Sequence, residues 1–219
     1  MNQRLEFDSI QLSFGNGNLL SNIYMLSEKG KITGLLGRNG SGKTTLMKIV
    51  FGATTFEQKS VRINSQSLGL NYLSENLIAY LPQRNLIPSY LTISKAFALF
   101  EIPEANVLEY FPETYNMMNF KPAGLSGGYL RIFEIFLVLK SKAMFCLLDE
   151  PFSGLTPVYV ERIKMILLET KKQKGIIITD HLHRHVVEIA DSLYLLANGQ
   201  TYRIEDPAQL ISLGYVNAL

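Results

Sequence analysis

The sequence predicts an α/β fold with a mostly parallel sheet, a smaller N-terminal antiparallel β subdomain and an inserted helical subdomain. Three observations support this prediction. Apolar strand candidates alternate with segments of helical periodicity after residue 126, a pattern typical of a parallel sheet covered by helices. Before residue 37, the chain contains only strand candidates and turns. Between residues 84 and 125, strand candidates stop and prolines separate short helical segments.

The N-terminal elements follow from apolar alternation and turn residues. Residues 4–14 and 19–27 alternate in part between apolar and polar side chains, and Gly15-Asn16-Gly17 is a turn signal between them. These hairpins are expected to form the second, smaller sheet. Four further elements are predicted: a short buried strand at 31–36, a helix at 44–51, and strands at 61–63 and 77–81.

The rest of the chain predicts one domain, residues 1–219, with the helical subdomain inserted at about 86–140. Aromatic residues such as Phe97 and Phe100 in this subdomain either contact a partner or form its own core. A helix is expected after Ser126 and up to about Lys140. The later elements are a strand at 143–149, a helix at 156–173, a strand at 175–180, a helix at 182–190 and two short strands.

Composition excludes several functional classes. The 21 basic and 19 acidic residues give a net charge of +2, so no bulk attraction to nucleic acid is expected. The N-terminus has no apolar signal region, and no apolar run approaches the roughly 18 residues that cross a bilayer. A membrane role therefore requires a partner. The single cysteine, Cys146, lies in an apolar run and is expected to be a core residue.

A glycine-rich segment carries the strongest chemical signal. Residues 37–44 read Gly-Arg-Asn-Gly-Ser-Gly-Lys-Thr and fit the phosphate-binding loop, or P-loop, at every required position. Its backbone amides and the following helix N-terminus suit a phosphate anion, Lys43 adds a positive charge, and the Thr44 hydroxyl can bind Mg²⁺. The alternative is a glycine-rich turn without a ligand. The segment predicts a P-loop NTPase core with these nucleotide-binding residues: Gly37, Asn39, Gly40, Ser41, Gly42, Lys43, Thr44 and Thr45.

An acidic pair follows the buried strand at 143–149. Open α/β sheets bind ligands at the carboxyl ends of their strands, where Asp149 and Glu150 are expected to lie. Asp149 is expected to hold Mg²⁺ directly or through water, and Glu150 to polarise the attacking water. The alternative is an acidic pair that caps the next helix.

Leu125-Ser126-Gly127-Gly128-Tyr129 opens a helix just upstream of that strand. With this segment the chain resembles the ABC (ATP-binding cassette) ATPases, whose signature is L-S-G-G-Q. The resemblance implies that Ser126, Gly127 and Gly128 contact the γ-phosphate of ATP held on the P-loop of a facing subunit. It covers essentially the whole chain, because five motifs occur in the family's order.

Three further motifs are implied by this resemblance. Tyr80-Leu81-Pro82-Gln83 is similar to the Q-loop, so Gln83 is expected beside Mg²⁺ together with Thr44 and Asp149. Thr179-Asp180-His181 is similar to the switch segment, which makes His181 a catalytic residue beside Glu150. Phe14 lies where the family stacks an aromatic ring on adenine, although it also suits the core at a strand end. His183 and His185 match no motif and are expected to be exposed.

The chain departs from the family's pattern at two motif positions, and its helical insertion is compact and rich in aromatic residues. Tyr129 replaces the signature glutamine, and Thr156 stands where the D-loop, here residues 152–157, carries aspartate. Because Glu150 and His181 are retained, we expect ATP hydrolysis. The alternatives are a non-transport ABC ATPase, or a subunit that binds ATP with weak or no hydrolysis.

The implied function is that of an ATP-hydrolysing subunit that powers an ABC transporter. ATP and Mg²⁺ are the implied cofactors. The implied partners are an identical chain or a paralogous cassette, and integral membrane transporter subunits, with no nucleic acid. The implied location is cytoplasmic, on the inner face of the cell membrane through the membrane partner. The segments 149–154 and 178–181 most resemble the branch serving lipopolysaccharide export and branched-chain amino-acid import.

Overall fold

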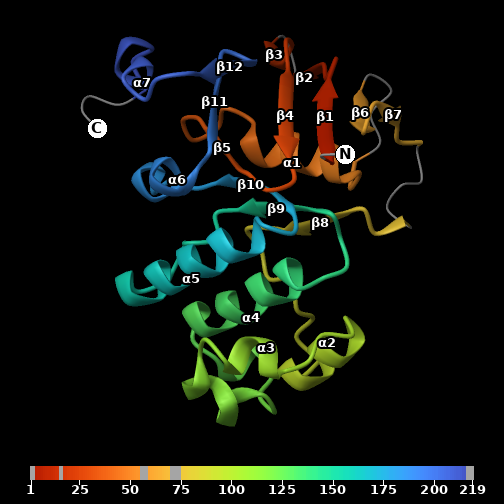
Figure 1. Ribbon diagram of the computed structural model, residues 1–219, viewed down its shortest axis with the longest axis vertical. Coiled ribbons are helices and arrows are strands. Elements are labelled where there is room, and N and C mark those ends of the chain that lie inside the picture. Colours follow the sequence, from red (N-terminus) through yellow and green to blue (C-terminus); the bar gives the residue numbers. More distant parts are fainter. Residues whose placement is uncertain (1–2, 15–16, 55–58, 70–74, 216–219) are drawn as a thin grey trace.

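A six-stranded sheet forms the centre of the molecule in the computed structural model (Figure 1). The structure describes residues 3–14, 17–54, 59–69 and 75–215, without the side chains of residues 13, 14, 17 and 18. The strand order is β12-β11-β5-β10-β9-β8. The bounds are β5 Ile32–Leu36, β8 Ile78–Leu81, β9 Phe145–Asp149, β10 Gly175–Thr179, β11 Ser192–Ala197 and β12 Gln200–Ile204.

Five of these strands are parallel, and only the edge strand β12 is antiparallel to its neighbour. The mostly parallel sheet predicted from the sequence is therefore confirmed. β10 lies between β5 and β9, and Thr179 at its end pairs with Asp149 at the end of β9. Because parallel strands end at the same edge of a sheet, the segments that follow β5, β9 and β10 meet there.

The N-terminal strands form two sheets rather than the one that the sequence predicts. A four-stranded antiparallel sheet has the order β4-β1-β6-β7, and β2 pairs only with β3. The predicted strand at 4–14 breaks after β1, where Ser9 has a positive φ of 55°, a conformation that ends a strand. The Gly15-Asn16 part of the turn lies outside the described residues. The bounds are β1 Arg4–Asp8, β2 Leu12–Phe14, β3 Gly17–Leu20, β4 Tyr24–Glu28, β6 Ser60–Ile63 and β7 Gln66–Ser67.

Helices cover both faces of the central sheet. The bounds are α1 Lys43–Phe51, α2 Ile93–Leu99, α3 Ala105–Leu108, α4 Gly127–Leu139, α5 Pro157–Thr170, α6 His183–Ile189 and α7 Gln209–Ser212, with short 3₁₀ helices η2 Pro112–Met117 and η3 Pro122–Gly124. The sequence pattern did not predict α7. Within the described ranges, no helix is both long enough and apolar enough to cross a bilayer.

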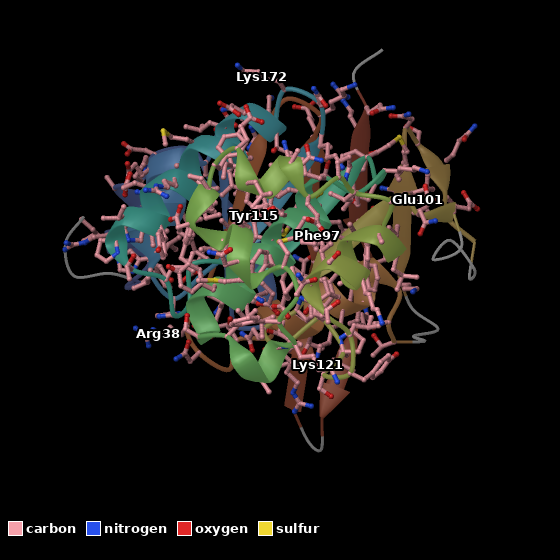
Figure 2. The ribbon with its side chains drawn as sticks, turned by 90° about the horizontal axis from the view of Figure 1, so that it is seen from below. Arg38, Phe97, Glu101, Tyr115, Lys121 and Lys172 are labelled. Carbon is pink, nitrogen blue, oxygen red and sulfur yellow. The ribbon has the colours of Figure 1, made fainter. Side chains whose placement is uncertain are left out.

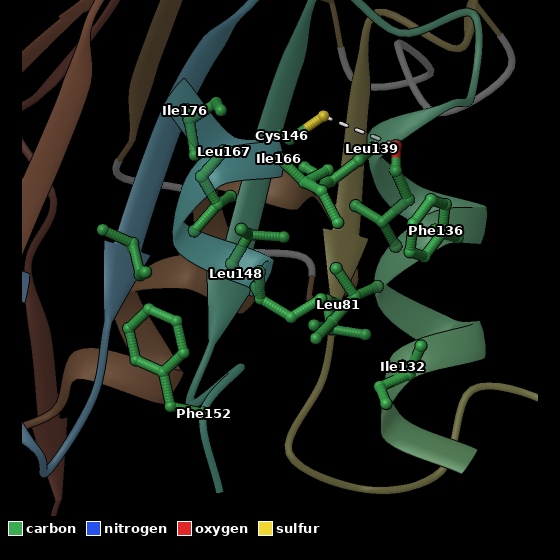
Figure 3. Close-up of a cluster of buried hydrophobic side chains, with 14 of the residues drawn as sticks. Leu81, Ile132, Phe136, Leu139, Cys146, Leu148, Phe152, Ile166, Leu167 and Ile176 are labelled. Atoms are coloured by element: carbon green, nitrogen blue, oxygen red, sulfur yellow. Dashed lines mark hydrogen bonds between the residues drawn. The ribbon is translucent and has the colours of Figure 1, made fainter. Parts of the chain in front are cut away.

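Two apolar cores explain why the central strands are uninterrupted apolar runs. On one face, Phe145 and Leu147 of β9 pack in the cluster that includes α1 and the four-stranded antiparallel sheet. On the other face, Cys146 and Leu148 pack in the cluster that includes α4 and α5 (Figure 3). Strands covered on both faces carry apolar side chains at every position. Cys146 is a core residue, as the sequence predicts, and burial raises the pKa of its thiol to about 11.

The segment between β8 and β9 is helical and packs onto α4. Phe97 of α2 meets Phe133 of α4 edge to face, with 6.1 Å between ring centroids. Phe97 is fully buried and lies in the middle of this segment, whereas Glu101 and Lys121 lie at its edges (Figure 2). Phe97 is therefore excluded as a partner-contacting residue, because no partner can reach its ring. Phe100 is 41% exposed and stays a candidate.

Replacing Phe133 by alanine should lower the free energy of unfolding by about 3–5 kcal/mol, because the change leaves a cavity under α2. Urea denaturation followed by circular dichroism measures the effect. Phe120→Ala is the matched control, since Phe120 is 48% exposed and its loss should cost under about 1 kcal/mol. Equal losses in the two variants would contradict the described packing.

Candidate nucleotide-binding site

The P-loop joins β5 to α1 and forms the floor of a cavity of about 400 Å³. Gly40 and Gly42 have φ values of 80° and 103°, a left-handed backbone that favours glycine. Gly42 also caps the N-terminus of α1, whose first amides have no partner within the helix. Those amides and the helix dipole make this end of α1 suited to an anion.

Six of the eight P-loop residues predicted to bind nucleotide line this cavity. Its lining consists of Leu19, Asn39, Gly40, Gly42, Lys43, Thr44, Thr45, Gln83 and Glu150. Ser41 points instead to a neighbouring cavity beside β11, and Gly37 contributes its carbonyl oxygen to Lys43. The side chain of Phe14 lies outside the described part of the chain, so its stacking on adenine stays a prediction.

Lys43 is buried at the base of the cavity and held by the loop itself. Its Nζ donates hydrogen bonds to the carbonyl oxygens of Gly37 at 2.7 Å and Arg38 at 3.2 Å. Burial lowers the pKa of this ammonium group, and the carboxylates of Glu150, Asp149 and Asp180 oppose that shift. A cation placed at a cluster of amides suits a polyphosphate.

The three residues expected to bind Mg²⁺ lie together, because Thr44 and Gln83 both approach the carboxylate of Asp149. This carboxylate accepts hydrogen bonds from the hydroxyls of Thr44 and Tyr80, the latter at 3.0 Å, while Gln83 Nε2 lies 3.5 Å from Asp149 Oδ1. Burial raises the pKa of Asp149 above its ordinary value. The oxygen donors in this cluster are the ligand type that Mg²⁺ prefers, so the residues present fit the ion.

Glu150 and His181, the predicted catalytic pair, face each other across the ends of β9 and β10. His181 Nδ1 lies 3.7 Å from Glu150 Oε2 and 3.3 Å from Asp180 Oδ1. Glu150 has a φ of 53°, a rare conformation for a non-glycine residue, and its amide donates to the Thr179 carbonyl at 2.7 Å. Backbone strain of this kind concentrates at functional sites.

The signature residues lie outside the P-loop cavity. Ser126 caps the N-terminus of α4, where its Oγ accepts a hydrogen bond from the Tyr129 amide at 3.3 Å. Ser126 and Gly127 are exposed, and Gly128 is partly buried. Gly127 lines a smaller cavity of about 240 Å³, which also includes Gln83 and Glu150. The described chain therefore presents the signature to its surroundings rather than to its own P-loop.

A buried arginine was missed by the sequence analysis. Arg131 of α4 donates hydrogen bonds to the carbonyl oxygens of Pro82 at 2.6 Å, Asp149 at 2.5 Å and Glu150 at 3.0 Å. Its guanidinium lies 3.5 Å from Glu134, whose Oε1 also accepts the amides of Leu86 and Ile87. Two opposite charges three residues apart in an otherwise apolar helix were the available signal.

Asp180 is a second buried carboxylate whose role the sequence did not reveal. Its Oδ2 accepts the Phe152 amide and its Oδ1 the Leu182 amide, each at 2.9 Å. It therefore joins the D-loop to the segment that contains His181. The prediction that His183 and His185 are exposed was wrong. Both are partly buried, because their rings pack against those of Tyr215 and Phe152, respectively.

Replacing Glu134 by glutamine should lower the free energy of unfolding by about 3 kcal/mol. Glutamine keeps an acceptor for the two amides but leaves the buried Arg131 cation without its counter-charge. Chemical denaturation measures the change. Glu101→Gln is the control, because Glu101 pairs with Lys142 on the surface at 69% exposure, where the loss of an ion pair should leave stability nearly unchanged. A Glu134→Gln protein as stable as the wild type would contradict this interpretation.

Comparisons with known proteins agree with this geometry. The sequence model of a family described as ABC transporter matches residues 20–153. The lipopolysaccharide export system ATP-binding protein LptB of Haemophilus influenzae is 28% identical over 223 residues, covering 95% of this chain and 92% of that protein. The high-affinity branched-chain amino acid transport ATP-binding protein BraG of Pseudomonas aeruginosa is 27% identical over 221 residues, 95% of each chain.

The fold agrees as well. The solved structure of an ATP-binding subunit of an ABC transporter superposes with a TM-score of 0.83 at 23% identity, covering 98% of this chain and 95% of that one. The family match spans more than half of the chain. The resemblance predicted from the five motifs is confirmed, and the chain belongs to the ABC transporter family as an ATP-binding subunit.

Proposed function

We propose that this chain pairs head to tail with an identical chain or a paralogous cassette, and that each closure seals two ATP molecules. One observation carries the proposal. The P-loop cavity gathers Lys43, Thr44, Gln83 and Glu150, whereas Ser126 lies outside it and is exposed. A site of this kind is completed when a second copy, related by two-fold symmetry, supplies its signature.

The binding roles follow from the chemistry of each group. Lys43 and the first amides of α1 hold the β- and γ-phosphates, and Phe14 stacks on adenine. Ser126, Gly127 and Gly128 of the facing subunit contact the γ-phosphate. Because these contacts form only when the two subunits meet, ATP favours the closed dimer by its differential affinity for that state.

Mg²⁺ accompanies ATP in this proposal. Thr44, Gln83 and Asp149 would hold the ion, and it would neutralise charge on the phosphate oxygens. The convergence of these three side chains supports the assignment. The buried position of Asp149 also favours a cation, because a bound positive charge offsets the cost of keeping the carboxylate ionised away from water.

Hydrolysis is assigned to Glu150 and His181. Glu150 orients the attacking water and accepts its proton, and His181 contacts the γ-phosphate. The 3.7 Å separation of Glu150 Oε2 and His181 Nδ1 supports their joint action on one reacting group. Loss of the γ-phosphate removes the group that both subunits hold, so the dimer reopens.

A groove between the core and the inserted helices is the proposed docking site for the membrane partner. In this proposal the chain is a single domain, residues 1–219, and the inserted helices belong to its helical subdomain at about 86–140. The groove beside them has a volume of about 580 Å³, and Leu86, Leu99 and Phe100 are among its lining residues. Leu99 is 70% exposed. Leu86 is three residues from Gln83, so events at the nucleotide reach this groove along one loop.

The occupant that we propose is a cytoplasmic helix of the integral membrane subunit, with an apolar side toward Leu99 and Phe100. This partner would place the chain on the cytoplasmic face of the cell membrane. The chain's small net charge of +2 supports a protein partner over nucleic acid. The names of LptB and BraG, as ATP-binding proteins of transport systems, support the same assignment.

Glu150→Gln should reduce phosphate release at least 100-fold while nucleotide binding persists, because the change removes the proton acceptor and keeps the shape. Lys43→Ala should instead weaken nucleotide binding at least tenfold, since it removes a buried positive charge at the phosphates. Phosphate release and a fluorescent ATP analogue measure the two effects. Equal phosphate release by the wild type and Glu150→Gln would favour a subunit that only binds ATP.

Leu99→Glu combined with Phe100→Glu should abolish co-purification with the membrane subunit, because two charges would enter the apolar groove. The isolated chain should keep its ATPase rate within about twofold, since the groove lies outside the P-loop cavity. Leu168→Glu is the control, an exposed leucine on α5. Retained co-purification in the double variant, or its loss in the control, would exclude this groove as the docking site.

A further inference from the structure

Tyr129, which replaces the signature glutamine, is held by another tyrosine of the same chain. Its hydroxyl lies 2.9 Å from the hydroxyl of Tyr159, and the two ring centroids are 5.7 Å apart. Both side chains are partly buried. The hydrogen bond from Tyr129 is the main reason that the pKa of Tyr159 rises to about 12. The Tyr159 hydroxyl therefore stays protonated at neutral pH and can share a hydrogen bond with the Tyr129 hydroxyl.

The tyrosine pair joins the first turns of two helices whose preceding loops both have functional roles. Tyr129 stands three residues after Ser126, the N-cap of α4, and Tyr159 stands three residues after Thr156, the N-cap of α5. The signature precedes one helix and the D-loop precedes the other. Figure 1 shows α4 and α5 running side by side below the sheet.

A backbone contact brings the same two loops together. A Cβ placed on Gly128 would lie 2.9 Å from the carbonyl oxygen of Gly154 in the D-loop. The N-terminus of α4 therefore touches the D-loop with no room for a side chain between them. This contact does not depend on the tyrosine hydroxyls, so it supports the same juxtaposition independently.

The pair also belongs to a larger network on one face of α5. The Tyr159 ring packs edge to face against Phe111 of the insertion at 5.6 Å, and the Arg162 guanidinium lies within 6 Å of both rings. Arg162 also forms an ion pair with Glu113 at 2.8 Å. The inserted helices are thus fastened to α5 close to the signature.

We propose that Tyr129 and Tyr159 are positioning residues that make the signature and the D-loop one rigid edge of the subunit. The inference rests on the proposed function, in which this edge meets the facing subunit. Tyr129 contacts its own chain instead of the neighbour's nucleotide. Its hydroxyl bond fixes Ser126 relative to Thr156, so both loops arrive at the facing subunit in register.

Hydrogen exchange tests the rigid edge without relying on catalysis. Tyr129→Phe and Tyr159→Phe each remove one hydroxyl and keep the ring. In either variant, the amides of residues 127–130 and 152–156 should exchange faster together, by about fivefold, because one hydrogen bond stabilised both loops. Acceleration in only one loop, or in neither, would overturn the proposal.

ATP-driven dimerisation tests whether the rigid edge helps the subunit to pair. In a Glu150→Gln background, the ATP concentration that gives half-maximal dimer in analytical ultracentrifugation should rise about threefold in either phenylalanine variant. The double variant should show no further rise, because both changes break the same bond. In the otherwise wild-type chain, the apparent KM for ATP should rise by the same factor while kcat stays within about twofold.

Tyr110→Phe is the matched control. Tyr110 also bonds its hydroxyl to α5, at Glu169 near the far end of the helix, so its loss should leave the dimerisation midpoint unchanged. If the ATP concentration for half-maximal dimer rose equally in this control, the tyrosine pair would only help to attach the insertion to α5. That result would overturn the inference. If the Glu150→Gln chain itself never dimerised with ATP, pairing with an identical chain would be excluded, and the exchange experiment would still decide on the rigid edge.

Discussion

The site depends on the hydrogen bonds that one buried cation, the Arg131 guanidinium, makes with backbone carbonyl oxygens. Arg131 lies in the interior, where an unpaired guanidinium costs several kcal/mol, and it is bonded to the carbonyl oxygens of Pro82, Asp149 and Glu150. None of these carbonyls can move away without leaving the cation short of acceptors. This one side chain of α4 therefore holds the Q-loop and the end of β9 against the helix.

This constraint explains how two demanding features persist beside the P-loop. Asp149 is fully buried, and its carboxylate accepts a hydrogen bond from the Tyr80 hydroxyl and lies close to the Gln83 amide group. Glu150 follows in a left-handed conformation. Its amide donates a hydrogen bond to the Thr179 carbonyl oxygen, and its own carbonyl oxygen accepts one from Arg131. A carboxylate in such a conformation persists because the surrounding structure over-determines it. The strain thus fixes the direction in which Glu150 leaves the sheet.

Most elements and site residues could be predicted from patterns among neighbouring residues. The features that were missed depend on contacts between residues distant in sequence. The P-loop and the apolar strand before Asp149 follow from glycine chemistry and burial on both faces, which neighbouring residues determine. The carbonyl partners of Arg131 lie 18 to 49 residues away in sequence, so no local pattern reveals them. Phe97 was ambiguous for the same reason, because an aromatic residue on a short helix looks the same in a core and on a docking surface. The break at Ser9 required a backbone conformation that serine rarely adopts.

The first two turns of α4 combine these constraints, and this explains why a tyrosine is compatible with the signature. Ser126 caps the helix, and Tyr129 bonds to α5 in the first turn. In the next turn, Arg131 donates to the Q-loop and to the end of β9, and Glu134 accepts two amides of the segment after the Q-loop. A helix fixed at three successive points has little freedom to tilt, so its cap is placed by its own subunit. The glutamine of the usual signature has no such ring to pack against Tyr159. In this chain, therefore, the aromatic ring contacts its own subunit, whereas Ser126 and Gly127 stay exposed.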